Sequence, residues 1–324
     1  MNDPQQIRID KTSVDVITSA YNEEECLSEL FQRLNVVFLE EAKYDFRVIV
    51  MDNGSTDSTW EIISSASKRN PKIHGFRMSR NFSLDAAFTC GLDNATADVA
   101  IIMTSDLQDP PEVIHRFLRE YENGFDHVVG KVTNRETVPL VRRILSGTFY
   151  NLASSLTDGL LPKSVSDFRL VTRKTYTAIR SLRESHRFFR GLGAWVGFKT
   201  LEIEIERPPR FAGKSKWLGI SLLRAISGAS KSILAFSAAP LVWVSMMGLF
   251  LSIFSALALI ILAFFWIVRG VPFAGYGSIV AIISLSFSLT MLGLGIVAQY
   301  VGLIYDEVKQ RPLYLIADRT SNPI

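Results

Sequence analysis

The stretch Phe46-Arg-Val-Ile-Val-Met51, followed by Asp52-Asn53-Gly54-Ser55, places a short valine-rich apolar run directly before a polar turn. A run of this length, bounded by a turn, predicts a buried β-strand. Similar runs alternate with helical patterns around it; the runs are Val14–Ile17, Ile73–Met78 and Val99–Met103, and the helical patterns are Glu23–Leu39, Ser58–Lys68 and Leu84–Asn94. Strands that alternate with helices predict an α/β fold built on a doubly wound, mostly parallel sheet.

Polar side chains follow each of the four predicted strands. They are Tyr21-Asn22-Glu23, Asp52-Asn53-Gly54-Ser55, Ser79-Arg80-Asn81 and Ser105-Asp106-Leu107-Gln108-Asp109. In an open α/β sheet the loops after the strands gather at one edge, and ligands bind there. One such loop would be read as an ordinary turn or helix cap, but four at the same edge predict a binding site.

The next hundred residues are less regular. Residues 111–200 mix helical patterns with a basic stretch, and Ser166–Leu170 is interpreted as a loop. Leu201–Glu206 alternates apolar and acidic residues, which predicts an edge strand. A basic loop with a glycine follows at Arg210–Trp217. Trp217–Phe236 has apolar residues at helical spacing with lysine and arginine between them, which predicts an amphipathic helix in the membrane surface; packing on the soluble domain is the alternative.

Two uncharged apolar runs, Pro240–Val268 and Ser278–Tyr305, lie near the C-terminus. Each exceeds the roughly 20 residues that an α-helix needs to cross a bilayer. The link between them is short and permits only a hairpin. We therefore expect a domain at 1–215, a juxtamembrane helix at 216–236, a two-helix transmembrane hairpin at 237–306 and a tail at 307–324.

Basic residues indicate which side of the membrane the domain occupies. They collect before the first run and after the second, whereas the connecting loop offers only Arg269. By the positive-inside rule both termini are cytosolic. No apolar segment typical of a signal peptide lies at the N-terminus, which agrees with this orientation. We expect a multi-pass protein of the inner (plasma) membrane.

The residues after the fourth predicted strand suit a phosphate-bearing substrate. Asp106 and Gln108 offer hard oxygen ligands, and Mg²⁺ or Mn²⁺ needs only a few of these beside substrate phosphate oxygens. Arg210 and Lys216 can neutralise a diphosphate, and Arg142 with Arg143 can hold a second phosphate. Each basic pair alone is also consistent with a solvated surface or with contact to anionic lipid headgroups.

At these residues the chain resembles the polyprenyl-phosphate glycosyltransferases of glycosyltransferase family 2, the group that contains dolichyl-phosphate mannose synthase and bactoprenol glucosyltransferases. The resemblance runs nearly end to end. The motifs that carry it are Ser19-Ala-Tyr21-Asn22-Glu23-Glu24, Asp52-Asn-Gly-Ser-Thr-Asp57, Ser79-Arg-Asn-Phe82, Asp106-Leu-Gln-Asp-Pro-Pro-Glu112, Asp167-Phe-Arg-Leu170, Phe189-Arg-Gly-Leu-Gly-Ala-Trp-Val-Gly197, Arg210 with Gly213-Lys-Ser-Lys216, and Tyr300-Val-Gly-Leu-Ile-Tyr305 to Arg311-Pro312.

The resemblance implies a GT-A fold and inverting transfer of one sugar from a nucleotide sugar, UDP-glucose or a related UDP-hexose, to polyprenyl (undecaprenyl) phosphate. The roles it implies are a nucleotide-sugar pocket of Tyr21, Asn22, Glu23, Asp52, Asn53, Arg80, Ser105, Arg210 and Lys216, an acceptor-phosphate site of Arg142 and Ser146, a divalent metal (Mg²⁺ or Mn²⁺) at Asp106, Gln108 and Thr104, and Asp167 as the catalytic carboxylate. It also implies a homo-oligomer such as a tetramer. We expect no nucleic-acid partner.

The chain departs from the family pattern at several positions. The usual Asp-x-Asp metal motif reads Thr104-Ser105-Asp106, so a hydroxyl replaces one carboxylate. Near the end of the second apolar run Gln299 and Leu303 replace the family's Glu and Arg. A degenerate, non-catalytic member that acts as a binding or scaffold protein is therefore the alternative. A processive synthase is disfavoured because no Gln-x-x-Arg-Trp motif occurs, and a dinucleotide enzyme because no Gly-x-Gly-x-x-Gly opens the first helix.

Overall fold

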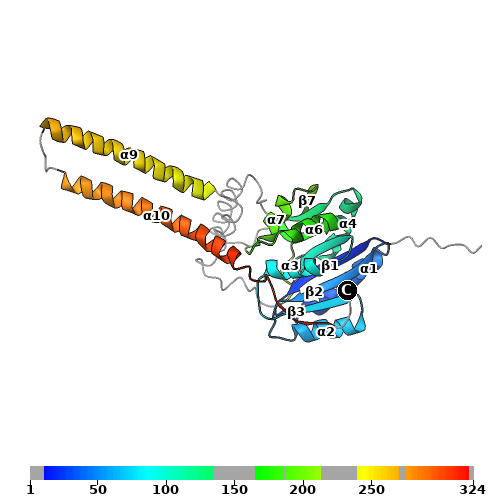
Figure 1. The fold of residues 1–324 in the computed structure, drawn as a ribbon. Helices are drawn as coiled ribbons and strands as arrows, with labels where there is room; N and C mark the ends of the chain where they lie inside the picture. Colours follow the sequence, from blue (N-terminus) through cyan, green and yellow to red (C-terminus); the bar gives the residue numbers. More distant parts are fainter. Residues whose placement is uncertain (1–10, 134–164, 186, 213–238, 270–274, 321–324) are drawn as a thin grey trace, which may run out of the picture. The chain divides into compact units, whose positions relative to one another are not determined.

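The computed structural model describes residues 11–133, 165–185, 187–212, 239–269 and 275–320. The chain divides into two compact units (Figure 1). One comprises Met1–Ile220 with Pro312–Ile324, and the other comprises Ser221–Arg311. The predicted juxtamembrane helix at 216–236 lies outside the described residues.

The first unit is built on a single mixed sheet. Its strands are β1 (Ser13–Ala20), β2 (Asp45–Asp52), β3 (Ile73–Met78), β4 (Val99–Thr104), β5 (His127–Val132), β6 (Val165–Thr172), β7 (Thr200–Ile205) and β8 (Ile316–Arg319). Their order across the sheet is β7-β5-β6-β4-β1-β2-β3-β8. Neighbours from β4 to β3 pair in parallel, as do β5 and β7, whereas β6 and β8 run antiparallel to their neighbours. The predicted doubly wound, mostly parallel sheet is confirmed.

Helices cover both faces of this sheet. They are α1 (Leu27–Glu40), α2 (Thr59–Arg69), α3 (Leu84–Asn94), α4 (Ile114–Glu122), α6 (Arg173–Ser181) and α7 (Phe189–Trp195), with a 3₁₀ turn at Pro111–Val113 before α4. Successive strand residues point to opposite faces, so one face packs on α1, α2 and α4 and the other on α3, α6 and α7. Phe168 and Val171 of β6, for example, belong to these two different cores.

Two strands depart from the sequence-based prediction. Ser166–Leu170 was predicted as a loop, which is wrong, because these residues form β6 between β4 and β5. The misreading has a physical cause: buried Asp167 and Arg169 interrupt the apolar pattern that marks an interior strand. The second strand, β8, comes from the C-terminal tail and pairs with the edge of β3, where Gly75 N donates to Thr320 Oγ1 at 3.0 Å. Leu201–Glu206 is confirmed as an edge strand, β7.

The parallel register brings the strand exits to one edge, as predicted. Ala20 at the end of β1 lies beside Asp52 at the end of β2. Ser19 lies beside Thr104 at the end of β4, on the other side of β1. The antiparallel β6 adds its beginning to the same edge, since its pairing with β4 runs from Thr172 back toward Asp167. Residues that are distant in sequence therefore meet there.

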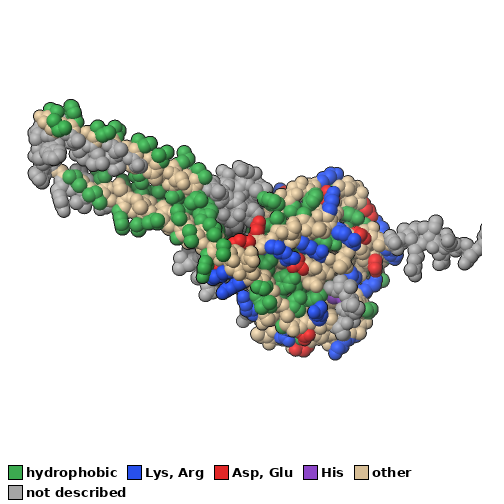
Figure 2. All heavy atoms as spheres, in the orientation of Figure 1, with side chains coloured by type: hydrophobic (Ala, Val, Ile, Leu, Met, Phe, Trp, Pro, Cys, Tyr) green, Lys and Arg blue, Asp and Glu red, His purple; other side chains and the backbone are tan. Residues whose placement is uncertain are grey.

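The second unit contains two long helices, α9 (Ala239–Arg269) and α10 (Tyr276–Val308). A Cβ added to Gly293 of α10 would lie 3.2 Å from Val244 of α9, so the middle of α10 contacts the first turns of α9. Large apolar side chains on both helices face outward, among them Phe250 and Ile283 (Figure 2). Among the described residues, one stretch, Leu285–Val308, is long and apolar enough to cross a membrane, and Pro240–Leu251 is a shorter apolar helix segment.

Candidate active site

A tight turn after β4 presents Asp106. Leu107 in this turn has a positive φ of 61°, an uncommon backbone conformation for a residue with a side chain. The turn brings the backbone N of Gln108 to 3.3 Å from Asp106 Oδ1, which fixes the direction of that carboxylate. The neighbouring Ser105 donates its hydroxyl to Ser19 O at 2.8 Å and so ties the turn to the end of β1.

Thr104 lies between two carboxylates. Its Oγ1 is 2.8 Å from Asp106 Oδ1 and 2.8 Å from Asp109 Oδ2. A hydroxyl has one hydrogen to donate, so it can satisfy only one of these carboxylate oxygens at a time. When it donates to Asp109, its lone pairs remain available as a second hard oxygen beside Asp106.

Arg210 joins the exits of β1 and β4. Its Nη2 donates to Glu23 Oε2, its Nη1 lies 3.3 Å from Asp106 Oδ2, and its Nε donates to Ala212 O at 2.7 Å. The three charged side chains are between 8% and 18% exposed, so water screens their attraction only in part. Burial would lower the pKa of Arg210, but its hydrogen bond to Glu23 outweighs this and raises that pKa above its ordinary value. The guanidinium therefore stays charged at the edge of the sheet.

A second arginine, Arg207, bonds residues next to this cluster. Its Nη2 lies 2.6 Å from the fully buried Asp109 Oδ1 and 2.8 Å from Ser166 Oγ. Asp109 in turn accepts the backbone N of Thr104 at 3.0 Å. These bonds link the beginning of β6 to the turn that carries Asp106. Sequence reasoning gave Arg207 no role in the site, and it included Asp109 only as one of the polar residues in the loop after the fourth predicted strand.

The loops after β1 and β2 are bonded to each other. Asn22, with a positive φ of 52°, donates its backbone N to Ser55 Oγ at 2.9 Å and accepts the backbone N of Thr56 at 2.9 Å. Asp52 accepts Ser55 N at 2.9 Å and lies 3.4 Å from the guanidinium of Arg77. Burial raises the pKa of Asp52 above its ordinary value, although the bonds from Ser55 oppose this.

The loops after β2 and β3 approach each other closely. Gly54 has a φ of +74°, and a Cβ there would lie 2.5 Å from the backbone of Arg80. Only glycine fits this contact without a shift of the backbone. Asn53 bridges the same loops, since it accepts Phe82 N at 3.0 Å and donates to Ser83 O at 3.0 Å. The guanidinium of Arg80 lies over the Phe82 ring, 4.0 Å from its centre. Ser83 also accepts Ala86 N at 3.1 Å and begins α3.

Asp167, at the beginning of β6, is held by an arginine of α7. Arg190 donates from Nε to Oδ1 at 2.8 Å and from Nη2 to Oδ2 at 2.6 Å. Burial alone would raise the pKa of Asp167, but the charge and hydrogen bonds of Arg190 bring it below its ordinary value. Asp167 points to the face of the sheet opposite to its neighbour Ser166, which contacts Arg207. Arg190 belonged to a motif quoted above but received no role there.

The residues around Asp106 fit a divalent cation. Asp106 Oδ1 and Thr104 Oγ1 are two hard oxygens 2.8 Å apart, and the Thr104 hydroxyl has a second carboxylate to which it can donate its hydrogen. Asp106 and Thr104 would hold the cation, which would supply positive charge beside a substrate phosphate. Mg²⁺ and Mn²⁺ accept such a small protein shell when substrate phosphates complete it. Among the described residues no group of three or more His, Cys, Asp or Glu side chains is arranged to bind a metal.

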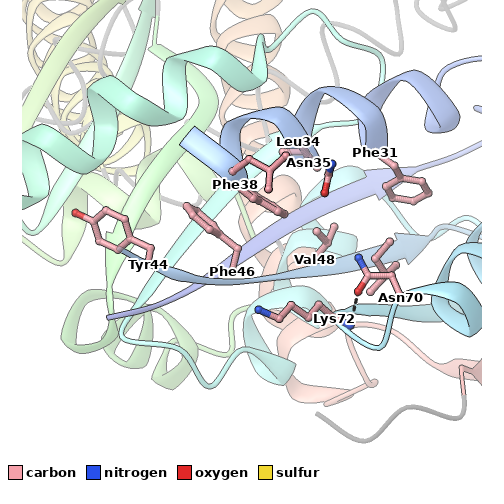
Figure 3. A pocket seen from close by; sticks show the side chains of 11 residues that line it. Phe31, Leu34, Asn35, Phe38, Tyr44, Phe46, Val48, Asn70 and Lys72 are labelled. Carbon is pink, nitrogen blue, oxygen red and sulfur yellow. Dashed lines mark hydrogen bonds between the residues drawn. The ribbon is translucent and has the colours of Figure 1, made fainter. Parts of the chain in front are cut away.

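An apolar groove of about 230 Å³ lies elsewhere on the first unit, between α1 and the beginning of β2 (Figure 3). Phe31, Phe38 and Tyr44 line it, with Lys72 at its margin. Its lining residues include none of the predicted site residues and no carboxylate, so it does not suit a metal-bound diphosphate.

The structure thus brings together most of the predicted nucleotide and metal residues at one edge of the sheet. Direct bonds link Glu23, Arg210, Asp106 and Thr104, and a second set of bonds links Asn22, Asp52 and Asn53 with the loops around them. Tyr21 directly follows β1 at this edge. The predicted residues Lys216, Arg142 and Ser146 lie outside the described residues.

Comparisons with known proteins agree on one family. A family model described as glycosyl transferase family 2 matches residues 15–179. The chain is 34% identical over 307 residues to the bactoprenol glucosyl transferase of Shigella phage SfX, which covers 94% of this chain and 99% of that protein. It is also 34% identical over 304 residues to an uncharacterized glycosyltransferase of Synechocystis sp., 94% of each chain.

Among solved structures, glucosyl-3-phosphoglycerate synthase from Mycobacterium tuberculosis, in complex with Mn²⁺, uridine diphosphate and phosphoglyceric acid, resembles this chain with a TM-score of 0.48 and 17% sequence identity. The likeness covers 69% of this chain and 77% of the synthase.

Proposed function

Because this chain belongs to glycosyl transferase family 2, we propose that it transfers one sugar from UDP-glucose or a related UDP-hexose to polyprenyl phosphate, with inversion at the sugar. The product would be a lipid-linked monosaccharide. The relatives named bactoprenol glucosyl transferase, one of them 34% identical over nearly the whole chain, support both substrates.

The observation that carries the proposal is the convergence of Glu23, Asp106 and Arg210 at the carboxyl edge of the sheet. A lone nucleotide diphosphate is strongly anionic and needs cations around it. Arg210 supplies one, and it already bridges the two loops between which a diphosphate would lie. Arg210 can exchange its carboxylate partners for the diphosphate when the donor arrives, since a guanidinium binds phosphate oxygens in the same forked geometry.

A divalent metal held by Asp106 and Thr104 would add Lewis-acid stabilisation of the departing diphosphate. Arg210 would neutralise the same charge from the other side. These groups stabilise the negative charge that develops on the diphosphate as its bond to the sugar breaks. Such electrostatic stabilisation usually makes the largest contribution to the rate in sites of this kind.

The acceptor needs little activation. A phosphate monoester has a second pKa near 6, so it is largely a dianion at neutral pH and is itself the nucleophile. The enzyme must mainly align it with the anomeric carbon. Both carboxylate oxygens of Asp167 are engaged by Arg190, which leaves Asp167 suited to orienting a sugar hydroxyl rather than to removing a proton.

We also propose that α9 and α10 both cross the membrane, as a hairpin with the first unit on the cytosolic side. Their outward-facing apolar side chains, such as Phe250 and Ile283, are costly in water and stable in lipid. A membrane location suits the acceptor, since a polyprenyl chain stays in the bilayer and presents its phosphate at the headgroup level. The homo-oligomer implied by the resemblance stays a prediction.

The decisive experiment is an assay of the full chain in membranes or mild detergent. A panel of radiolabelled nucleotide sugars is incubated with undecaprenyl phosphate and Mn²⁺, and lipid extracts are separated by chromatography. We expect one donor to label the lipid, and EDTA to abolish the label. Nucleotide binding without labelled lipid from any donor would instead favour a non-catalytic binding or scaffold protein, the reading that Thr104 supports.

Asp167→Asn tests the role of Asp167 within this reaction. The amide keeps the shape but loses the charge that pairs with Arg190, so we expect kcat at neutral pH to fall by about 100-fold. Asp45→Asn, in an exposed ion pair with Lys72, is the matched control and should leave kcat unchanged. Undiminished turnover of Asp167→Asn would remove Asp167 from any essential role.

A further inference from the structure

Asp167 is the more deeply buried member of its ion pair, and Arg190 approaches it as a fork. Its side chain is 10% exposed, against 28% for Arg190. One guanidinium nitrogen bonds each carboxylate oxygen, at 2.8 and 2.6 Å. Two parallel bonds of this kind fix the plane of the carboxylate as well as its position, which a single contact from a lysine cannot do.

The helix that carries Arg190 is itself fixed by buried charged groups. At the start of α7, the backbone N of Phe189 donates to Asp85 Oδ1 at 3.0 Å. Arg169 of β6 donates to Asp167 O at 3.2 Å and to Phe189 O at 3.5 Å. A Cβ at Gly193 would lie 2.7 Å from Arg169 Nη1, so the glycine lets α7 pack directly on this buried guanidinium. The position of Arg190 is therefore set by packing.

From this geometry we infer that Arg190 is the positioning residue of Asp167, and that Asp85 holds Arg190 in place by bonding the start of α7. The inference rests on the proposed function, in which Asp167 orients the sugar. Arg190 acts through Asp167 and need not touch the substrate itself.

Four charged side chains surround Asp167, on the elements that pack against it. Arg190 faces it from α7, Arg169 from its own strand, Arg207 from the segment after β7, and Asp85 from α3. The arginines lower the pKa of Asp167 against the effect of burial. Asp85 is a like charge: burial and the charge of Asp167 together raise the pKa of Asp85 to about 6, so Asp85 is protonated at the lower pH where Asp167 titrates.

The test is the pH dependence of kcat in Arg190→Gln, Arg190→Lys and Asp85→Asn. In the wild type the second pKa of the acceptor phosphate, near 6, sets the acid limb. Without the guanidinium, burial raises the pKa of Asp167, and we expect it to pass that of the phosphate, so that the acid limb of Arg190→Gln moves to higher pH. We expect its kcat to fall by about 100-fold, with little change in KM for the nucleotide sugar. Arg190→Lys keeps the charge but not the fork, so its acid limb should stay near that of the wild type while kcat remains about 10-fold low.

Asp85→Asn should leave the acid limb near that of the wild type. Asp85, with a pKa of about 6, is already protonated at the lower pH where Asp167 titrates, and the amide can still accept the backbone N of Phe189. The matched control is Arg33→Gln: Arg33 is also 28% exposed and also forked on a carboxylate, that of Glu112, and this variant should behave as the wild type.

The outcomes separate the inference from the function. A wild type that labels lipid, with an Arg190→Gln variant whose kcat and acid limb are unchanged, would overturn the inference and leave the function intact. If Arg190→Gln does not fold, shown by a lost unfolding transition, Arg190→Lys decides, and a kcat equal to that of the wild type in this variant would overturn the inference. A wild type that labels no lipid from any donor would refute the proposed function itself.

Discussion

Asp106 and Asp167 lie near the same edge of the sheet, but their counter-charges come from different kinds of structure. Asp106 pairs with Arg210, which follows the last strand of the core sheet on an irregular segment, at 3.3 Å. Asp167 pairs with Arg190, on a helix that packs against buried Arg169, at 2.6 Å. The first pair is bonded through one nitrogen, and the second through two.

The difference teaches how one site can both exchange ligands and hold its geometry. A single, longer contact from a segment without regular structure can be replaced by a diphosphate at small cost. A forked contact from a packed helix cannot be replaced without disturbing the core. We therefore interpret the Asp106 side as the part that binds and releases the donor, and the Asp167 side as the part that stays fixed.

The largest effect on activity is expected from a change at Asp106, and it should distinguish Asp106 from an ordinary surface carboxylate. Asp106→Asn removes the charge that Arg210 and a metal would share, and we expect kcat/KM to fall by about 1,000-fold. Labelled-lipid formation at several Mn²⁺ concentrations measures it, with Asp45→Asn as the control. A loss of less than threefold would break the comparison, because Asp106 would then have no part in binding the donor diphosphate.

A stability measurement tests whether the core holds the Asp167 side of the site. Arg169 is 1% exposed and donates to the carbonyls of Ser166, Asp167 and Phe189, so Arg169→Met leaves buried acceptors unpaired. Breaking such a buried charged group costs about 3 kcal/mol. The midpoint of thermal unfolding in detergent should fall by about 6 to 12 °C. Lys131→Met, in an exposed ion pair, should leave the midpoint within about 2 °C. Equal midpoints in both variants would show that the Asp167 side is not held by its core.

The smallest expected effect concerns the departure at Thr104. Thr104→Asp places a second carboxylate beside Asp106 and should lower the Mn²⁺ concentration for half-maximal activity by about 10-fold, because a charged ligand strengthens a hard-cation site. Metal titration of the activity measures it. An unchanged midpoint of the titration would mean that Thr104 is not a metal ligand.

The half of the fold that follows the β-α-β pattern was predictable from sequence. β3 and α3 have the predicted bounds, because a short, mostly apolar run and a helical spacing of apolar residues mark these largely buried elements. β6 was not predictable, since its core positions alternate with buried Asp167 and Arg169, charges that only tertiary partners make acceptable. β8 was missed for another reason: it is short, exposed and stabilised by pairing with β3 rather than by its own composition.

The candidate site was predictable where one loop carries several polar residues. Glu23, Asp52 and Asp106 each follow a predicted strand, and the parallel register brings them to one edge. The roles of Arg190 and Asp85 were not predictable, because each residue pairs with one that is distant in sequence. Arg190 pairs with Asp167, and Asp85 accepts the backbone N of Phe189. The sequence contains these residues but not the chain path that joins them.

The pairing of β8 with β3 sets an order for the synthesis of this protein. Gly75 and Thr320 are bonded across 245 residues, and both long apolar helices lie between them in the chain. The ribosome therefore makes the last strand of the sheet only after both long apolar helices have left it. Until then the edge of β3 is unpaired and open to strands of other chains. Nascent chains at this stage need protection from one another, and a chain that stops after α10 keeps that open edge for good.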